Sequence, residues 1–328
     1  MSTRFTEKSG ICGILLSGSA KSGDMGGMKL TIGLVLTFLA ALFFTAEAGA
    51  VAGHRVTGDE AKATARFWTP DRIEQATGRD PVFGSVPAGA AATGLRHRPV
   101  TVSRPEVGKI LGWDRRGGFS CTGSVIVTES LRLVVTAAHC VYANGSWVRR
   151  MAFIPDFKRG RRPYGTYKVR TAWVSNWWQR FSFGTYGANF DIAILVTRRT
   201  ANGSRIGENV GAIPIQSYPK RRGTTDIYGY PAGTMRGRAM RTCRTHTRPD
   251  WFGGRFFPGP TGLLARCNMA AGSSGGPWVS RYRRPNGGTI GVIDGLTSTG
   301  YPQAGRSYLT SPYFGRLLVR LINAAEGR

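Results

Sequence analysis

Three short segments constrain this chain more than any other feature of its sequence. Residues 136–140 read TAAHC, residues 189–195 read NFDIAIL and residues 272–277 read GSSGGP. A serine hydroxyl is a poor nucleophile at neutral pH, so it needs a base to take its proton and an acid to hold that base. The chain offers these three residue types in the order His139, Asp191 and Ser274. The order predicts a nucleophilic serine site assembled from all three segments.

The composition predicts a folded protein that is rich in strands. Hydrophobic residues make up 41% of the 328 residues, which is far more than a disordered chain contains. The 46 Gly and 17 Pro favour many turns between short strands over long helices. The length admits one large domain or two moderate ones, with a sizeable core in either case.

The chain is strongly basic, with 45 Lys and Arg against 18 Asp and Glu and a net charge of +27. A field of this sign would concentrate acidic polymers at the surface. The alternative is that the charge only keeps the protein soluble, because the Arg residues are scattered, mostly as pairs. No nucleic-acid-binding motif accompanies them. The sequence thus gives no specific nucleic-acid motif, and the net positive charge favours acidic polymers as partners only in a general way.

The N-terminal region indicates export. Lys29 precedes an apolar run over 30–44, and an A-x-A site follows it. A basic residue, an apolar core and such a site are typical of a secretory signal peptide, here residues 28–50. The run is shorter than the ~20 residues of a membrane-spanning helix, which argues against an uncleaved anchor. We expect a secreted protein with no stable membrane anchor after signal cleavage.

The signal segment divides the rest of the chain. Residues 1–27 have no periodicity, so translation starts either at Met1 or at Met28, where a signal peptide should begin. Residues 51–104 are then either a propeptide that is removed or an ordered N-terminal extension packed on the domain. Residues 105–328 hold the domain itself.

Short apolar runs separated by turns predict β-strands from residue 107 onward. The predicted strands are 107–113, 120–127, 131–136, 151–154, 166–174, 191–196, 226–228, 289–293 and 307–309. Thr69 as N-cap with Pro70 at the first helical position predicts a short helix. Apolar residues at helical spacing between Tyr313 and Ile322 predict an amphipathic C-terminal helix. Many strands closed by one terminal helix favour an all-β fold with a pair of β-barrels.

Four of the five cysteines follow the signal segment. An even number in an exported domain favours two disulfides. Proximity in the sequence favours Cys121–Cys140 and Cys243–Cys267 over the other pairings. Each bond closes a loop of about 20 residues, which is worth about 3 kcal/mol in the chain-entropy model. The first bond would fix the loop that contains His139.

The segment 107–325 resembles the trypsin-like, chymotrypsin-fold serine endopeptidases. Within them it is most similar to the secreted bacterial branch that includes the glutamyl endopeptidases. The resemblance rests on the three motifs in this order behind a signal peptide. It implies two six-stranded antiparallel β-barrels with a C-terminal helix, and hydrolysis of peptide bonds through an acyl-enzyme. It also implies a protein or peptide substrate and no cofactor.

The resemblance implies a role for each matching residue. Ser274 would be the nucleophile, His139 the general base, and Asp191 the acid that orients His139. The backbone N–H groups of Gly272 and Ser274 would form the oxyanion hole. Glycines suit this loop, because converging N–H groups need backbone angles that other residues rarely adopt.

The sequence departs from trypsins at two positions. Ser273 stands where animal trypsins have the Asp that receives the new N-terminal amine, so activation by the trypsin route does not follow. Asn268 stands where trypsins have the Asp that binds Arg or Lys side chains, so that preference does not follow either. Glutamyl endopeptidases use a His on the strand lining the specificity pocket, and residues 291–298 contain none. We expect Asn268 and Asp294 near the specificity pocket, where Asp294 either reaches a basic side chain or caps a turn.

Other classes of function fit the sequence less well. The remaining histidines, His54, His97 and His246, form no carboxylate–His cluster with zinc-ligand spacing, so we expect no metal site. His246 is predicted in an Arg/Thr-rich loop. The main alternative is a catalytically weak protease-fold protein that binds acidic polymers through its basic surface. An esterase is disfavoured, because the nucleophile-elbow motif of α/β-hydrolases is missing from the sequence.

Overall fold

The computed structural model describes residues 50–79, 99–182, 187–232, 236–250, 259–269, 271–283, 288–303 and 306–328. All of them belong to one compact unit of the chain, residues 45–328. The predicted signal segment, apart from its last residue, lies outside the described ranges. Within those ranges no helix is long and apolar enough to cross a membrane.

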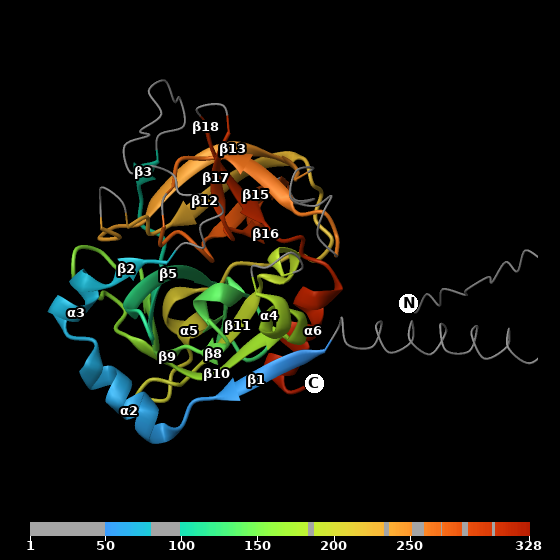
Figure 1. Ribbon diagram of the computed structural model, residues 1–328. Coiled ribbons are helices and arrows are strands. Elements are labelled where there is room, and N and C mark those ends of the chain that lie inside the picture. Colours follow the sequence, from blue (N-terminus) through green and yellow to red (C-terminus); the bar gives the residue numbers. More distant parts are fainter. Residues whose placement is uncertain are drawn as a thin grey trace, which may run out of the picture. The chain divides into compact units, whose positions relative to one another are not determined.

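Six antiparallel strands in the first half of the domain close into a barrel (Figure 1). They are β4 Val107–Asp114, β5 Gly117–Val125, β6 Leu133–Thr136, β9 Arg149–Pro155, β10 Tyr167–Ser175 and β11 Ala193–Thr197. Their order is β10-β11-β6-β5-β4-β9, and β9 pairs back with β10 to close the barrel. A short hairpin of β7 Tyr142–Ala143 and β8 Ser146–Trp147 lies between β6 and β9 in the chain. The first predicted barrel is therefore confirmed, with strand ends shifted by a few residues.

A second sheet, largely from the latter half of the chain, provides the other layer of the fold. Its strands are β3 Val100–Thr101, β12 Gly223–Gly229, β13 Arg241–Pro249, β14 Leu263–Arg266, β15 Pro277–Arg283, β16 Thr289–Leu296, β17 Gly300–Gln303 and β18 Arg306–Ser311. The order is β16-β15-β12-β13-β14-β18-β17, with β3 on β13. The chain after β16 returns to β18, where the Ser298 N–H donates to the Thr310 carbonyl (2.8 Å) and the Thr310 N–H to the Thr299 carbonyl (2.8 Å). The segment that follows β16, at one end of the sheet, thus pairs with β18, near the other end.

The prediction of a loop around His246 is wrong, because residues 241–249 form the central strand β13. The buried positions of this strand include Thr245 and Thr247, while Arg244 and His246 are exposed. Threonine gives a much weaker apolar alternation than Val or Ile, so the strand was missed. Strands β14 and β15 were also absent from the predicted series.

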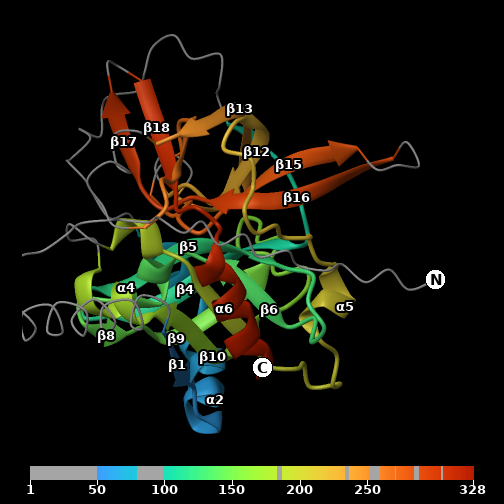
Figure 2. The ribbon, with the colours of Figure 1, turned by 90° about the vertical axis from the view of Figure 1, so that its right-hand side faces the viewer.

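The helices are short and lie outside the sheets. They are α2 Gly58–Phe67, α3 Pro70–Gln75, α4 Asn176–Phe181, α5 Ile206–Val210 and α6 Arg316–Glu326, with 3-10 turns η1 Ala138–Cys140 and η2 Ala188–Phe190. The predicted start of α3 is confirmed, since the Thr69 hydroxyl accepts the Arg72 N–H at 3.3 Å. The predicted C-terminal helix is α6, which buries Leu318 and Leu321 and packs on β10 and β11 (Figure 2).

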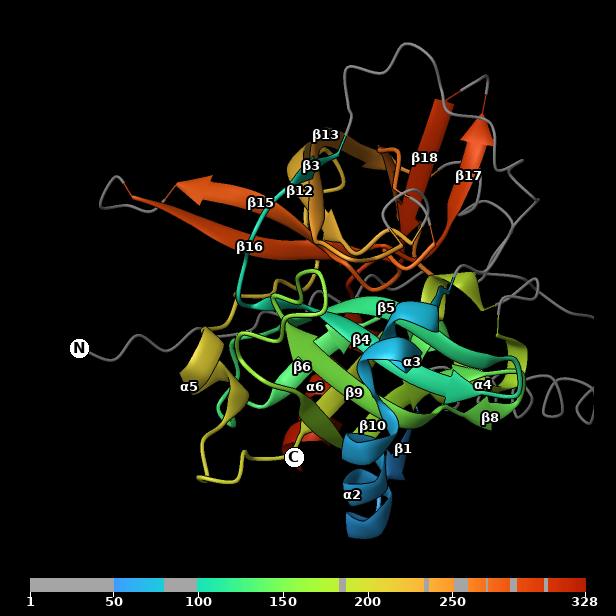
Figure 3. The same ribbon diagram turned by 90° about the vertical axis from the view of Figure 1, so that its left-hand side faces the viewer.

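Residues 51–79 of the N-terminal extension are packed on the first barrel, whereas β3 pairs with the second sheet. Strand β1 (Val51–Arg55) pairs with β10, and β2 (Thr77–Gly78) pairs with β5. Between them, α2 and α3 run along the barrel (Figure 3). Trp68 is 2% exposed, and its indole N–H donates to the Arg150 carbonyl at 2.6 Å. Residues 51–79 are therefore held by a sheet pairing at each end and by buried side chains between them.

The structure contains both predicted disulfides. Cys121 on β5 is bonded to Cys140 in η1, and Cys243 on β13 is bonded to Cys267 just after β14, each with a Cα–Cα distance of 6.3 Å. The first bond connects the turn that contains His139 directly to the barrel wall.

Lys109 on β4 is an ionisable residue buried between the first barrel and the segment between β12 and β13. It is 1% exposed, its ammonium donates to the Gly237 carbonyl at 3.3 Å, and it lies 4.9 Å from the centroid of the Phe157 ring. Burial lowers the pKa of Lys109 from 10.5 to about 8, and the charge of Glu74 opposes this shift. A buried amine is costly to keep charged.

The buried amine predicts a rise of stability with pH. Below about pH 8 both the folded and unfolded states bind the proton, whereas between the folded pKa of about 8 and the ordinary value of 10.5 only the unfolded state does. The free energy of unfolding should therefore rise through this window by up to about 3 kcal/mol, and Lys109→Met should remove that rise. Urea unfolding near pH 7 and near pH 10 measures it, with the exposed Lys62→Met as the matched control. The same pH slope in the parent and in Lys109→Met would contradict the prediction.

Candidate active site

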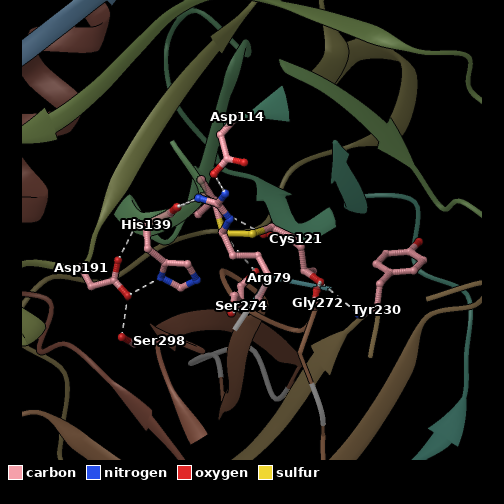
Figure 4. The surroundings of a disulfide bond; sticks show 12 residues. Arg79, Asp114, Cys121, His139, Asp191, Tyr230, Gly272, Ser274 and Ser298 are labelled. Atoms are coloured by element: carbon pink, nitrogen blue, oxygen red, sulfur yellow. Dashed lines mark hydrogen bonds and ion pairs between the residues drawn. A yellow bond between two sulfur atoms is a disulfide. The ribbon is translucent and has the colours of Figure 1, made fainter. Parts of the chain in front are cut away.

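His139 and Asp191 form a buried pair (Figure 4). Nδ1 of His139 lies 2.9 Å from Oδ2 of Asp191, and the His139 backbone N–H donates to Oδ1 at 2.9 Å. The Ser298 hydroxyl donates to Oδ2 at 2.6 Å. Asp191 is 0% exposed, so these three donors replace the water that a carboxylate would otherwise bind. The arrangement fixes the orientation of the imidazole ring.

The register of the first barrel explains why these two residues meet. Strand β6 ends at Thr136, three residues before His139, and β11 begins at Ala193, two residues after Asp191. The two strands are antiparallel neighbours, and Thr136 pairs with Ala193. The segments leaving β6 and entering β11 therefore lie at the same edge of the barrel.

The loop of Ser274 depends on glycine. Gly272 and Gly275 have φ angles of +92° and +79°, a region that residues with a Cβ rarely adopt. A Cβ on Gly275 would lie 2.1 Å from the Thr136 hydroxyl oxygen, so the loop fits against the first barrel only without one. The Thr122 N–H donates to the Ser274 carbonyl at 2.8 Å. Ser274 is thus attached to the barrel that contains His139.

The Gly272 N–H and the Ala271 carbonyl belong to the same peptide group, so a hydrogen bond to that carbonyl orients the N–H. The Ala232 N–H donates to the Ala271 carbonyl at 2.6 Å. Because the N–H and C=O of a trans peptide point to opposite sides, the Gly272 N–H points away from Ala232. It donates to the carbonyl oxygen of Arg79 at 3.1 Å. The Thr122 hydroxyl holds the next peptide by donating to the Gly272 carbonyl at 2.8 Å.

Arg79 is a residue of this site that sequence reasoning missed. Its carbonyl oxygen also accepts the Ser274 hydroxyl, at 3.0 Å. Its guanidinium pairs with Asp114 and donates to the His139 carbonyl at 3.1 Å (Figure 4). Arg79 lies 195 residues before Ser274, so the sequence around the serine could not indicate this contact.

The two predicted specificity residues lie in different surroundings. Asp294 on β16 accepts the Tyr282 hydroxyl at 2.8 Å within the β15–β16 hairpin. Burial raises the pKa of Asp294 and that of Tyr282. Asn268 is exposed in the loop that follows Cys267. A role for either residue in specificity stays a prediction.

One group of metal-ligand side chains occurs in the described part of the chain. It consists of Cys121, His139 and Cys140, whose ligand atoms lie within 4.8 Å of one another. The two sulfur atoms are joined in a disulfide, so they offer no thiolate to a metal ion. The cluster is accounted for by the disulfide.

The closed antiparallel barrel, the second sheet and the C-terminal helix define a chymotrypsin-like fold (Figure 1). The model of the trypsin-like peptidase domain matches residues 121–287, and the chain belongs to that family. It is a serine-type endopeptidase, a hydrolase of peptide bonds. No curated protein matches the chain.

Solved structures of bacterial-type proteases have the same fold. The protease Anisep from Arthrobacter nicotinovorans is 25% identical, with a TM-score of 0.60 over 71% of this chain and 100% of that one. A thermostable serine protease from an extremophilic microorganism is 25% identical, with a TM-score of 0.55 over 68% and 98%. A Glu endopeptidase is 20% identical, with a TM-score of 0.52 over 73% and 100%, which shows a shared fold alone.

Proposed function

We propose that this endopeptidase is secreted and that it hydrolyses peptide bonds through an acyl-enzyme formed on Ser274. One observation supports this most: a carbonyl oxygen already lies 3.0 Å from the Ser274 hydroxyl and 3.1 Å from the Gly272 N–H. A scissile carbonyl needs the same two neighbours, a nucleophile and an oxyanion donor. The buried His139–Asp191 pair supports the assignment of base and acid.

In the proposed reaction, His139 takes the hydroxyl proton while Ser274 Oγ attacks the carbonyl carbon. The negative oxygen of the tetrahedral intermediate accepts the N–H groups of Gly272 and Ser274, and Asp191 stabilises the imidazolium. His139 then gives its proton to the leaving amine. Water, deprotonated by His139, hydrolyses the acyl-enzyme and restores the Ser274 hydroxyl. Losing one oxyanion donor typically costs about 10²–10³-fold in rate.

Two further parts of the proposal concern location and partners. The pattern of residues 28–50 and two disulfides support secretion, because disulfides persist in oxidising compartments. Arg244, His246 and Arg248 are all exposed on β13, which supports acidic polymers as additional partners. Asn268 carries no charge, so it offers no ion pair to a basic substrate side chain.

Prolonged incubation with excess fluorophosphonate tests the nucleophile. We expect a single mass adduct that maps to the peptide containing Ser274, because only an activated serine attacks the probe. The adduct should be lost in His139→Ala and in protein unfolded by urea before labelling. A folded chain that gains no adduct would contradict the proposed mechanism. It would favour instead a catalytically weak protein that binds acidic polymers.

A further inference from the structure

The N-terminal extension ends beside the candidate catalytic centre. Thr77 and Gly78 of β2 pair in parallel with Phe119 and Ser120 of β5. The Arg79 N–H continues this pairing by donating to the Ser120 carbonyl at 2.9 Å. The extension therefore adds a short strand to β5, and Arg79, the next residue, contacts Ser274.

The carbonyl of Arg79 occupies two groups that the proposed reaction needs, the Gly272 N–H for the substrate carbonyl and the Ser274 hydroxyl for attack. Its oxygen accepts the Gly272 N–H at 3.1 Å and the Ser274 hydroxyl at 3.0 Å. A hydroxyl has one proton to donate, and here that proton is directed to a carbonyl oxygen. A substrate carbonyl cannot occupy the same position at the same time. Binding of residues 77–79 and binding of substrate are mutually exclusive in this geometry.

The side chain of Arg79 anchors this contact. The guanidinium pairs with Asp114, donates to the His139 carbonyl at 3.1 Å and lies 3.6 Å from the centroid of the Phe119 ring. The Arg79 side chain is only 13% exposed. A partly buried guanidinium with a carboxylate, a carbonyl and an aromatic face as partners is well compensated. Burial of Trp68 and Ile73 upstream keeps the segment close to the site.

Gly78 permits the close approach of the extension to the loop of Gly272. A Cβ at Gly78 would lie 2.4 Å from the Cβ of Ala232 and 2.5 Å from the carbonyl oxygen of Ala271. Those two residues orient the Gly272 N–H, so they have little freedom to move aside. Any side chain at position 78 would therefore destabilise the bound conformation of residues 77–79.

We propose that residues 77–79 are a tethered inhibitor of this endopeptidase, in which the Arg79 carbonyl occupies the position of a substrate carbonyl. The enzyme is latent while the segment is bound and active once it is displaced or removed. The inference rests on the proposed function, because it takes Ser274 as the nucleophile.

The rate of fluorophosphonate labelling tests the inference in the full chain, with intact mass recorded to show that residues 51–79 are still attached. Gly78→Ala should label Ser274 at least ~10-fold faster than the parent, since the added methyl group disfavours only the bound segment. Gly58→Ala is the matched control, because a Cβ there has no atom within 4 Å. Arg79→Ala removes the anchoring side chain without adding an atom and should also label faster. Hydrolysis of a denatured protein substrate should follow the same order.

The possible outcomes separate the two proposals. If either Gly78→Ala or Arg79→Ala labels no faster than Gly58→Ala, the tethered-inhibitor inference is overturned while Ser274 remains the nucleophile. If no variant labels even after prolonged incubation, the nucleophile assignment itself has failed. Faster labelling of both variants, with the control at the parent rate, supports the inference.

Discussion

Replacing Ser274 with alanine should lower kcat/KM for peptide hydrolysis by about 10⁴–10⁶-fold. The variant keeps the fold and the Gly272 N–H, but it has no oxygen to form the acyl-enzyme. The residual rate over water would come from substrate binding and the oxyanion donors alone. Steady-state hydrolysis of a peptide library measures the effect, in the parent chain and again in the Gly78→Ala chain, where we expect higher activity.

The adjacent serine provides a matched control. Ser273 is also buried in the same loop, and Ser273→Ala removes one hydroxyl oxygen just as Ser274→Ala does. Activity should survive in Ser273→Ala within about tenfold, since the lost group does not attack the substrate. A comparable loss in both variants would show that the hydroxyls matter for the loop structure, and it would count against Ser274 as the nucleophile.

Replacing Asp191 with asparagine should lower kcat by about 10⁴-fold without unfolding the protein. The carboxylate accepts the His139 backbone N–H on one oxygen, and both Nδ1–H and the Ser298 hydroxyl on the other. An amide has a single acceptor oxygen. If that oxygen faces the fixed backbone N–H, its NH₂ group faces Nδ1, which must then accept. The ring proton moves to Nε2, where it prevents His139 from taking a proton from Ser274.

Ser298→Ala separates the tautomer effect from a general weakening of the site. It removes one hydrogen bond to Asp191 but leaves the charge and both contacts to His139, so a loss of about tenfold is expected. Single-turnover kinetics and thermal unfolding of Asp191→Asn, Ser298→Ala and the parent give both readouts. Equal losses in the two variants would contradict the tautomer argument.

Much of the fold was predictable where the buried positions of a strand are aliphatic. Strands β4, β6 and β11 bury Ile110, Val135 and Ile194, so their apolar runs are clear in the sequence. The helix α6 was equally clear from its helical spacing. Strand β13 was missed because threonines occupy buried positions, where only the surrounding sheet makes them interior residues.

By itself, the sequence determined the residue types at the candidate centre and the family. His139, Asp191 and Ser274 each lie in a short motif whose local chemistry can be read from a few neighbours. The two cysteine pairs were equally accessible, because their partners are only 19 and 24 residues apart.

Only the tertiary structure brought Thr122, Ser298 and Arg79 to the site. Their contacts with Gly272, Asp191 and Ser274 span 150, 107 and 195 residues. Such contacts follow from which strands become neighbours, in the register that buries the most apolar surface. No local sequence pattern indicates which strands become neighbours or in which register they pair. The sequence therefore named the groups that could do the chemistry, while the packing of the two sheets and the extension decided which backbone and hydroxyl groups surround them.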